Sequence, residues 1–292
     1  MAGKPFLSPG EVLAADQKLA AEGVSVVERP NKAMLEWLRT PPFYNGPIDL
    51  PSIGRWFDDA WKGLHPSVQF TDRPFMFLAV SALGVSYRCD PPIVFGSLSI
   101  NPMSLIRMTN EESHRIFHQA PLDWWELHNQ AVDCMDLWLN RMEFQGGATA
   151  FKRLSVAVGQ LEASARQLVA SSLDPSLAQG VAMIAEMSLK AVLSKLGLTD
   201  DELVSLSHHL GKAVKRLAEL SPHPANDELV HVVASLPKYA TVRYDPPDWK
   251  IADAQDHFRR ALFVASEAMR RVGRYQTADQ VRQDSTVPKR RW

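Results

Sequence analysis

Residues 175–197, PSLAQGVAMIAEMSLKAVLSKLG, predict the helix that decides the fold. Their side chains are apolar nearly all round a helix, which is typical of a helix buried at the centre of a bundle. Pro175 suits the first turn of a helix, and Gly197 suits its end. One stripe of this helix is polar, and its members are Gln179, Glu186, Lys190 and Ser194. Glu186 and Lys190 are four residues apart with the acid first, the favoured order for an ion pair.

The segments that follow predict further helices joined by short connections. We expect helices near 149–172, 200–220, 226–236 and 249–272. Thr199 followed by three acidic residues is typical of a helix start, because a hydroxyl caps the first turn and acids suit the helix dipole. Short connections between amphipathic helices make antiparallel neighbours. Residues 148–275 are therefore predicted to form an antiparallel helical bundle, and the chain to be mainly α.

Residues 1–147 differ in composition from the rest of the chain, because proline and tryptophan are frequent there. Proline breaks helices, so the elements should be short. Ser8 and Glu11 have the spacing of a capping box. Helices are predicted near 9–21, 31–38, 51–61, 103–118 and 122–144, with a short strand at 24–27. We expect an irregular α+β module.

A turn signal, Cys89-Asp90-Pro91-Pro92, separates the apolar segments 75–88 and 93–100. They could form a hairpin, although the first could equally be a buried helix. Residues 276–292 are expected to be a basic flexible tail.

The composition excludes several classes of protein. The chain of 292 residues carries 32 Lys and Arg against 33 Asp and Glu, so no global positive field attracts nucleic acid. Two cysteines exclude a disulfide scaffold and a Cys-rich zinc module. We expect reduced thiols in a cytoplasmic protein. The longest apolar run, 13 residues at 75–87, is too short to span a membrane, which needs about 20.

The sequence contains none of the common motifs that identify an enzyme. It contains no Walker loop, GxGxxG, HExxH, GxSxG or CxxC motif. We therefore expect no catalytic residue, no cofactor and no metal, and an enzymatic role stays an open question.

The C-terminal half resembles the HEPN domain family. The segment Ala185–Leu193, AEMSLKAVL, followed by Gly197, is similar to the E-x-x-LKA-L-L…G helix of that family. His208-His209-Leu210 stands where the family has His-Asp-Leu, with His209 as the departure. The segment Tyr239–Asp245, YATVRYD, supplies the Arg-Tyr that often precedes the last helix. Order and spacing agree over about 150–275.

The resemblance implies a bundle that binds nucleotides or RNA, forms dimers and works in a stress, defence or toxin–antitoxin setting. Some family members are ribonucleases that use an Arg, a polar residue and, after four to six more residues, a His. Arg107…His114 and Arg216…His223 match only loosely, and neither lies on the last helix. We therefore expect a member without ribonuclease activity.

Six residues are candidates for the ligand site. Lys190, Lys212 and Arg243 would hold a phosphate, because arginine offers bidentate hydrogen bonds. Tyr244 could stack on a base. Glu186 could orient Lys190 or accept from a ribose. His208 lies four residues before Lys212, and the full set is Glu186, Lys190, His208, Lys212, Arg243 and Tyr244. The alternative is that Arg243 and Glu186 form a structural ion pair.

Two other functions remain open. The chain could be an interaction protein, with residues 1–147 docking a protein partner and the bundle forming a homodimer. It could also be a di-metal bundle, because Glu111 and His114, and Glu228 and His231, have the Glu-x-x-His spacing of such proteins. His114 and His118, four residues apart, would be half a metal site; a solvated helix face is the simpler interpretation.

Overall fold

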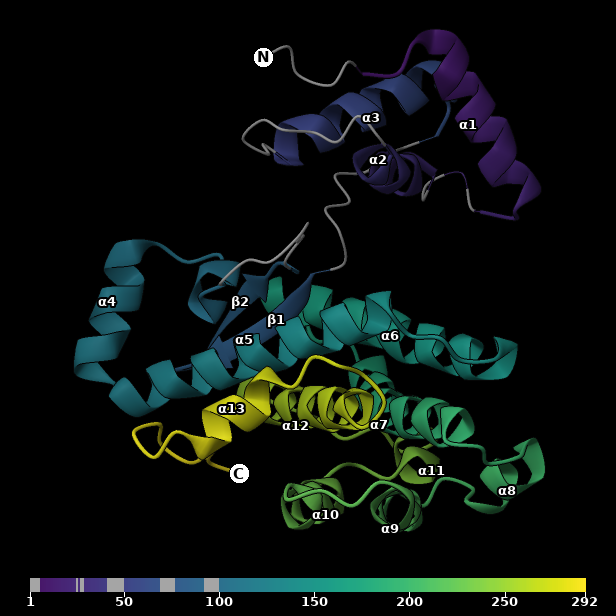
Figure 1. The fold of residues 1–292 in the computed structure, drawn as a ribbon. Helices are drawn as coiled ribbons and strands as arrows, with labels where there is room; N and C mark the ends of the chain where they lie inside the picture. The colour runs from purple at the N-terminus through teal and green to yellow at the C-terminus, as the bar shows by residue number, and fades with distance from the viewer. Residues whose placement is uncertain (1–5, 25, 27–28, 41–49, 69–76, 92–99) are drawn as a thin grey trace. The chain divides into compact units, whose positions relative to one another are not determined.

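The computed structural model describes residues 6–24, 26, 29–40, 50–68, 77–91 and 100–292 (Figure 1). The described chain is mainly helical, as predicted, with one small antiparallel sheet. It divides into two compact units, Met1–Met76 and Phe77–Trp292. The boundary expected near residue 147 is therefore not where the chain divides. The reason is that the segment from the hairpin to residue 142 packs onto the bundle helices.

The N-terminal unit contains α1 (Pro9–Ala21), α2 (Arg29–Arg39) and α3 (Leu50–Leu64). The capping box of Ser8 and Glu11 is present at the start of α1. Apolar side chains of all three helices form the core, and Asp16 is buried beside it. Asp16 accepts hydrogen bonds from Arg29 and from the indole of Trp61. The strand expected at 24–27 lies largely outside the described residues.

The C-terminal unit begins with a β-hairpin, β1 (Leu78–Ala82) and β2 (Val85–Cys89), with Ser81 opposite Ser86. Leu83 and Gly84 form the turn with φ of 53° and 76°. Two positive φ values suit the right-handed twist of a two-residue hairpin. The first apolar segment thus forms a hairpin in itself and is not a buried helix, whereas its expected pairing with 93–100 falls largely on residues that the structure does not describe. Residues 92–99 lie outside the described residues.

A short connection leads from the hairpin to the bundle. It contains the 3-10 helix η1 (Pro102–Leu105) and α4 (Asn110–Gln119). One helix was expected over 103–118. The structure has two shorter helices instead, because Ile106 between them forms a β-bridge with Cys89. Thr109 then caps the start of α4 by accepting a hydrogen bond from the backbone N–H of Glu112.

The bundle helices are arranged in layers (Figure 1). The bounds are α5 (Pro121–Met142), α6 (Ala148–Val169), α7 (Ser176–Lys195), α8 (Asp200–Ser205), α9 (Leu210–Leu220), α10 (Asn226–Ala234), α11 (Tyr239–Val242), α12 (Ile251–Arg270) and α13 (Thr277–Gln283). Helices α7 and α12 form the middle layer; α5 and α6 pack on one side, and α9 and α10 on the other. The helix expected at 200–220 is two helices, because Ser207 takes φ of 50° between them.

Helix α7 is the central helix that the sequence predicts. By length and hydropathy alone it could cross a membrane, but 72% of its apolar window is buried inside the fold. That burial is typical of the core helix of a globular unit. The two cysteines, Cys89 in β2 and Cys134 in α5, are both free and buried.

Residues 276–292 are not the flexible tail that the sequence predicts. Part of it is α13, and the last residues lie against α5 and α12 rather than extending into solvent. Arg290 forms an ion pair with buried Asp133, and the indole of Trp292 donates to Glu228. The arginines of this segment are therefore paired with carboxylates of α5, α12 and α13.

Candidate functional site

The candidate site is centred on Glu186, which α7 places in the interior of the bundle. Only 4% of this residue is exposed. Lys190 lies one turn later and brings its Nζ to 2.8 Å from Oε1 of Glu186. The second carboxylate oxygen, Oε2, lies 2.8 Å from Nδ1 of His208. One buried carboxylate therefore fixes two basic side chains, and the pair expected from the i, i+4 spacing is present.

The connection between α8 and α9 places His208 at this site. Buried Leu203 anchors α8 on the bundle, and the positive φ of Ser207 then turns the chain. His209 follows as the residue that precedes the first turn of α9. Because the turn ends α8 early, His208 faces α7 although its side chain stays 48% exposed.

Tyr239 completes one side of the site. Its ring centroid lies 4.8 Å from that of His208, and its hydroxyl accepts a 3.3 Å hydrogen bond from Gln179 of α7. Helix α11 is held there because Val242 is buried against Ala178 and Ala182. The sequence motif around Arg243 contains Tyr239, but only the tertiary packing shows that it contacts His208.

The contacts at Glu186 determine which nitrogen of His208 remains available. An ionised carboxylate only accepts hydrogen bonds, so Nδ1 of His208 carries a proton in this contact. Nε2 is then the nitrogen left for a ligand, as an acceptor in the neutral ring and a donor in the imidazolium. A buried carboxylate is costly unless it is paired, and both of its oxygens are paired here. The arrangement can hold a phosphate or move a proton.

The other three predicted residues lie outside this cluster. Lys212 is exposed on the first turn of α9, and Arg243 and Tyr244 are exposed after α11. The guanidinium of Arg243 lies 5.3 Å from the ring centroid of Tyr244. Among the described residues, Glu186 forms its ion pairs with Lys190 and His208, so the alternative pairing with Arg243 is not formed.

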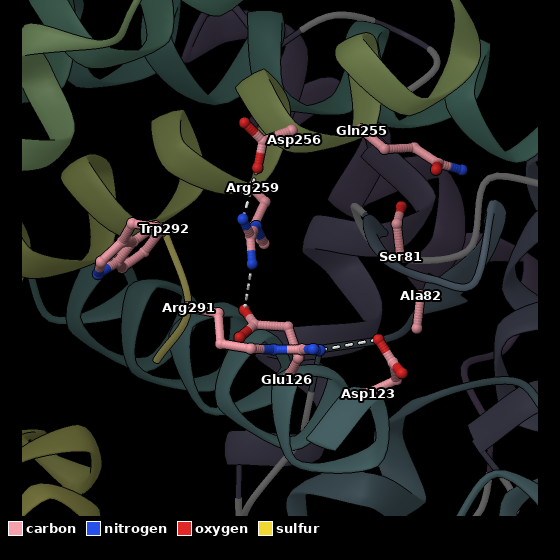
Figure 2. A pocket seen from close by; sticks show the side chains of 9 residues that line it. All are labelled: Ser81, Ala82, Asp123, Glu126, Gln255, Asp256, Arg259, Arg291 and Trp292. Atoms are coloured by element: carbon pink, nitrogen blue, oxygen red, sulfur yellow. Dashed lines mark hydrogen bonds and ion pairs between the residues drawn. The ribbon is translucent and has the colours of Figure 1, made fainter. Parts of the chain in front are cut away.

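A separate cavity of about 340 Å³ lies between the hairpin, α5, α12 and the C-terminal residues (Figure 2). Both of its arginines are already paired with carboxylates. Arg259 contacts Glu126 and Asp256, and Arg291 contacts Asp123 at 2.8 Å. The cavity therefore offers a phosphate no unneutralised cation, and we do not assign it a ligand.

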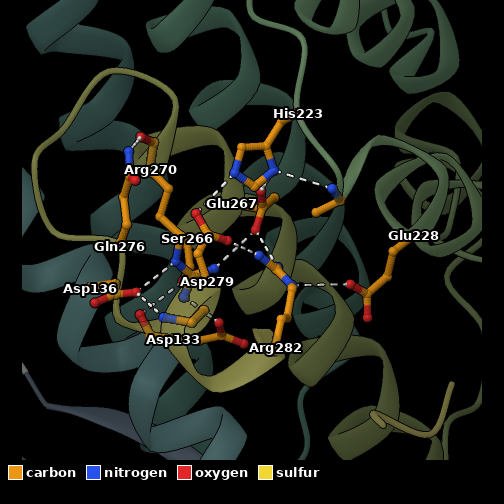
Figure 3. A network of polar contacts seen from close by, with 12 residues as sticks. Asp133, Asp136, His223, Glu228, Ser266, Glu267, Arg270, Gln276, Asp279 and Arg282 are labelled. Atoms are coloured by element: carbon orange, nitrogen blue, oxygen red, sulfur yellow. Dashed lines mark hydrogen bonds and ion pairs between the residues drawn. The ribbon is translucent and has the colours of Figure 1, made fainter. Parts of the chain in front are cut away.

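A network of buried charges joins α5, α12 and α13 (Figure 3). Arg270 is fully buried and contacts Asp133, Asp136 and Glu267. Burial raises the pKa of Glu267, but Arg270, Arg282 and Arg271 outweigh it and hold the pKa at about 2. Every charge named here has an opposite partner within the protein, which is the pattern of a structural network.

The loose ribonuclease matches are not assembled into a site. Arg216 pairs with Glu219, whereas His223 contacts Asp279 and Glu267 in the buried network. His114 lies beside His118 on α4. In the described part of the chain, Arg216, His223 and His114 thus contact groups other than their matched partners.

The part of the chain that the structure describes does not contain the ligand set that a di-metal site needs. There, no three His, Cys, Asp or Glu side chains are grouped so that they could hold a metal ion. Glu228 is instead in contact with Arg282 and Trp292.

Comparisons with known proteins add no relative. No family model matches the chain, and neither the curated proteins nor the solved structures give a significant match. The geometry of the site therefore carries the functional argument.

Proposed function

We propose that this protein binds the phosphate of a nucleotide or RNA at the site formed by Glu186, Lys190 and His208. The observation that carries the proposal is that buried Glu186 fixes a half-exposed imidazole through Nδ1 and leaves Nε2 for a ligand. A basic group held in place before the ligand arrives loses little freedom on binding. The resemblance to HEPN domains, which implies nucleotide or RNA binding, supports the same assignment.

The surroundings of His208 are basic although the chain as a whole is not. Lys212 and Lys215 are exposed on α9, which follows His208 directly, and Lys238 is exposed immediately before Tyr239. Because the ring of Tyr239 contacts that of His208, these segments lie on one side of the bundle. A local patch of this kind attracts phosphate groups without a global positive charge.

The aromatic residues suit a nucleoside better than a bare phosphate. Tyr239 lies against His208, and Tyr244 is 79% exposed five residues later. Base stacking on an aromatic ring contributes about 1–3 kcal/mol per base. Nε2 of His208 and the exposed lysines Lys212 and Lys215 would therefore hold the phosphate while a tyrosine contacts the base, and Lys190 would stay paired with Glu186.

We further propose that the protein binds RNA without cleaving it. Cleavage by the mechanism that the resemblance implies needs an Arg beside the His that acts. At the proposed site, His208 is held by Glu186 and flanked by Tyr239. Dimer formation through the bundle stays part of the proposal; exposed Phe151 and Val169 of α6 are the apolar residues that a second copy would cover.

The test is a binding panel of nucleoside monophosphates, triphosphates and short single-stranded RNAs, read by thermal shift and fluorescence anisotropy. We expect the wild type to bind at least one class and His208→Gln to weaken that binding tenfold or more. His209→Gln is the matched control, because the neighbouring histidine is exposed and precedes α9 without contacting Glu186. Equal affinity in the two variants, or no binding by the wild type, would contradict the proposal.

A further inference from the structure

Helix α4 carries a pair of histidines outside the proposed phosphate site. His114 and His118 are separated by one helical turn, and their Nε2 atoms lie 3.0 Å apart. Their ring centroids are 4.2 Å apart, with an angle of 57° between the ring planes. Both residues are exposed to solvent. Two imidazole nitrogens this close together on an accessible surface can serve as two of the ligands of one transition-metal ion.

We propose that His114 and His118 form a two-histidine site for a late divalent transition-metal ion, with Cu²⁺ preferred. Imidazole nitrogens coordinate such ions at about 2.0–2.1 Å. With that bond length, two nitrogens 3.0 Å apart subtend about 90° at the ion. Neighbouring ligands at about this angle fit a tetragonal site, and the preference for Cu²⁺ follows from the Irving–Williams order, in which Cu²⁺ binds nitrogen donors more tightly than Ni²⁺ or Zn²⁺ does.

The position of α4 fixes the two side chains relative to each other. Thr109 caps the start of the helix, and Ile116 is buried on the face toward the unit. The ring of Phe117 stands edge-on to that of His118 and to that of Trp124 in α5. His118 is thus in contact with Phe117, which in turn contacts Trp124, while the exposed side of the pair leaves room for water or for a donor from another molecule to complete the coordination.

The competing explanation is a hydrogen bond between two neutral imidazoles, in which one ring donates to the other. A hydrogen bond and a bound ion place the nitrogens at the same separation, so the distance does not decide between them. The two explanations predict different metal affinities. An ion bound by both rings is held more tightly than an ion bound by one ring, because the second imidazole is present at a high effective concentration. The gain in affinity is commonly a factor of about 10²–10⁴. Removing either ring should therefore remove nearly all of the affinity.

The experiment is a titration of the untagged, EDTA-treated and dialysed full chain with Cu²⁺, followed by calorimetry and by electron paramagnetic resonance. We expect one site per chain with hyperfine coupling to nitrogen, and an affinity order of Cu²⁺ above Ni²⁺ and Zn²⁺. His114→Gln and His118→Gln should each weaken Cu²⁺ binding at least tenfold. Since both side chains are exposed, the thermal unfolding of these variants should match the wild type.

His231→Gln is the matched control, because His231 is a single exposed histidine on α10. It should leave the Cu²⁺ affinity unchanged. The proposal is overturned if the wild type shows no stoichiometric site, or if the double variant of His114 and His118 binds Cu²⁺ as tightly as the wild type. The His208→Gln variant should retain the site, so this outcome is independent of the phosphate-binding proposal.

Discussion

At the scale of single residues, Glu186 explains why one polar stripe exists on an otherwise buried helix. Its carboxylate is almost fully buried and accepts from Lys190 and His208. A buried group of this kind is stable only while both oxygens are paired. Glu186 is therefore a structural residue and a positioning residue at once, because it sets the orientation of the imidazole.

Replacing Glu186 tests the structural part of that role. Glu186→Gln keeps the shape of the side chain but removes the charge and turns one acceptor into a donor facing Lys190 or His208. We expect the free energy of unfolding to fall by about 1–3 kcal/mol, measured by urea denaturation at pH 7. The control is Glu219→Gln on α9. Its ion pair with Arg216 is exposed on both sides, so the change should cost about 0–1 kcal/mol.

At the scale of elements, the corner between α12 and α13 depends on one glycine. A Cβ at Gly273 would lie 2.1 Å from Oδ1 of Asn140, and Asn140 is buried in α5. That amide accepts from the backbone N–H of Tyr275 and donates to its carbonyl. Any side chain at position 273 must therefore displace Asn140 and break both hydrogen bonds.

Gly273→Ala should accordingly lower the free energy of unfolding by about 2–4 kcal/mol. Gly159→Ala is the comparison, because Gly159 lies inside α6 and a Cβ there meets nothing within 4 Å. Alanine favours the helix, so this second change should add about 0.5–1 kcal/mol. Thermal melting of the two variants checks the sign of each effect, and a stable Gly273→Ala would contradict the described corner.

Much of the secondary structure could be predicted because its causes are local. The capping box at Ser8 and the cap at Thr199 mark helix starts in the sequence, and both are present in the structure. The break at Ser207 was missed, since serine seldom adopts a positive φ and nothing nearby signals it. The hairpin turn at Leu83 is not predicted because leucine seldom adopts a positive φ, and because Cys89-Asp90-Pro91-Pro92 is the stronger turn signal in the sequence.

The site was predictable only where spacing along one helix decides it. The Glu186–Lys190 pair follows from i, i+4 geometry, and it is present. The contacts of His208 with Glu186 and Tyr239 join three separate elements, so they depend on packing that the sequence pattern does not contain. Lys212, Arg243 and Tyr244 are exposed near this packing, and their role in binding stays a prediction.

At the scale of the whole C-terminal unit, the last residues hold α5 and α12 together. The guanidinium of Arg290 is nearly buried and contacts both oxygens of Asp133, which also contacts Arg270. The neighbouring Arg291 contacts Asp123 at the surface, with 48% of its side chain exposed. Two adjacent arginines thus make ion pairs of very different burial.

Arg290→Ala should destabilise the protein by about 2–4 kcal/mol, because it leaves a buried carboxylate with one partner fewer. Arg291→Ala should cost only about 0–1 kcal/mol, because its ion pair is exposed and screened. Chemical denaturation of both variants measures the difference. Equal effects would mean that the C-terminal segment is not docked on the bundle.

Acid should unfold this unit in a defined range. The pKa of Glu267 is about 2 in the folded protein, below its ordinary value of 4.5. The unfolded chain therefore binds the proton first, so stability from this group is complete above about pH 4.5 and is lost as the pH falls toward 2. The contribution is about 3 kcal/mol. The midpoint of urea unfolding should fall between about pH 4.5 and pH 2, and a flat profile over that range would contradict the paired network.

The central claim concerns the state of one imidazole, and long-range proton–nitrogen NMR of His208 measures it directly. With His208→Gln used to assign the signals, we expect the free protein to carry the proton on Nδ1, as the contact with Glu186 requires. Adding the nucleotide or RNA that binds should shift the Nε2 resonance of His208 and leave that of His209 unchanged. A ring protonated at Nε2 alone, or an Nε2 resonance that does not move at saturating ligand, would contradict the account.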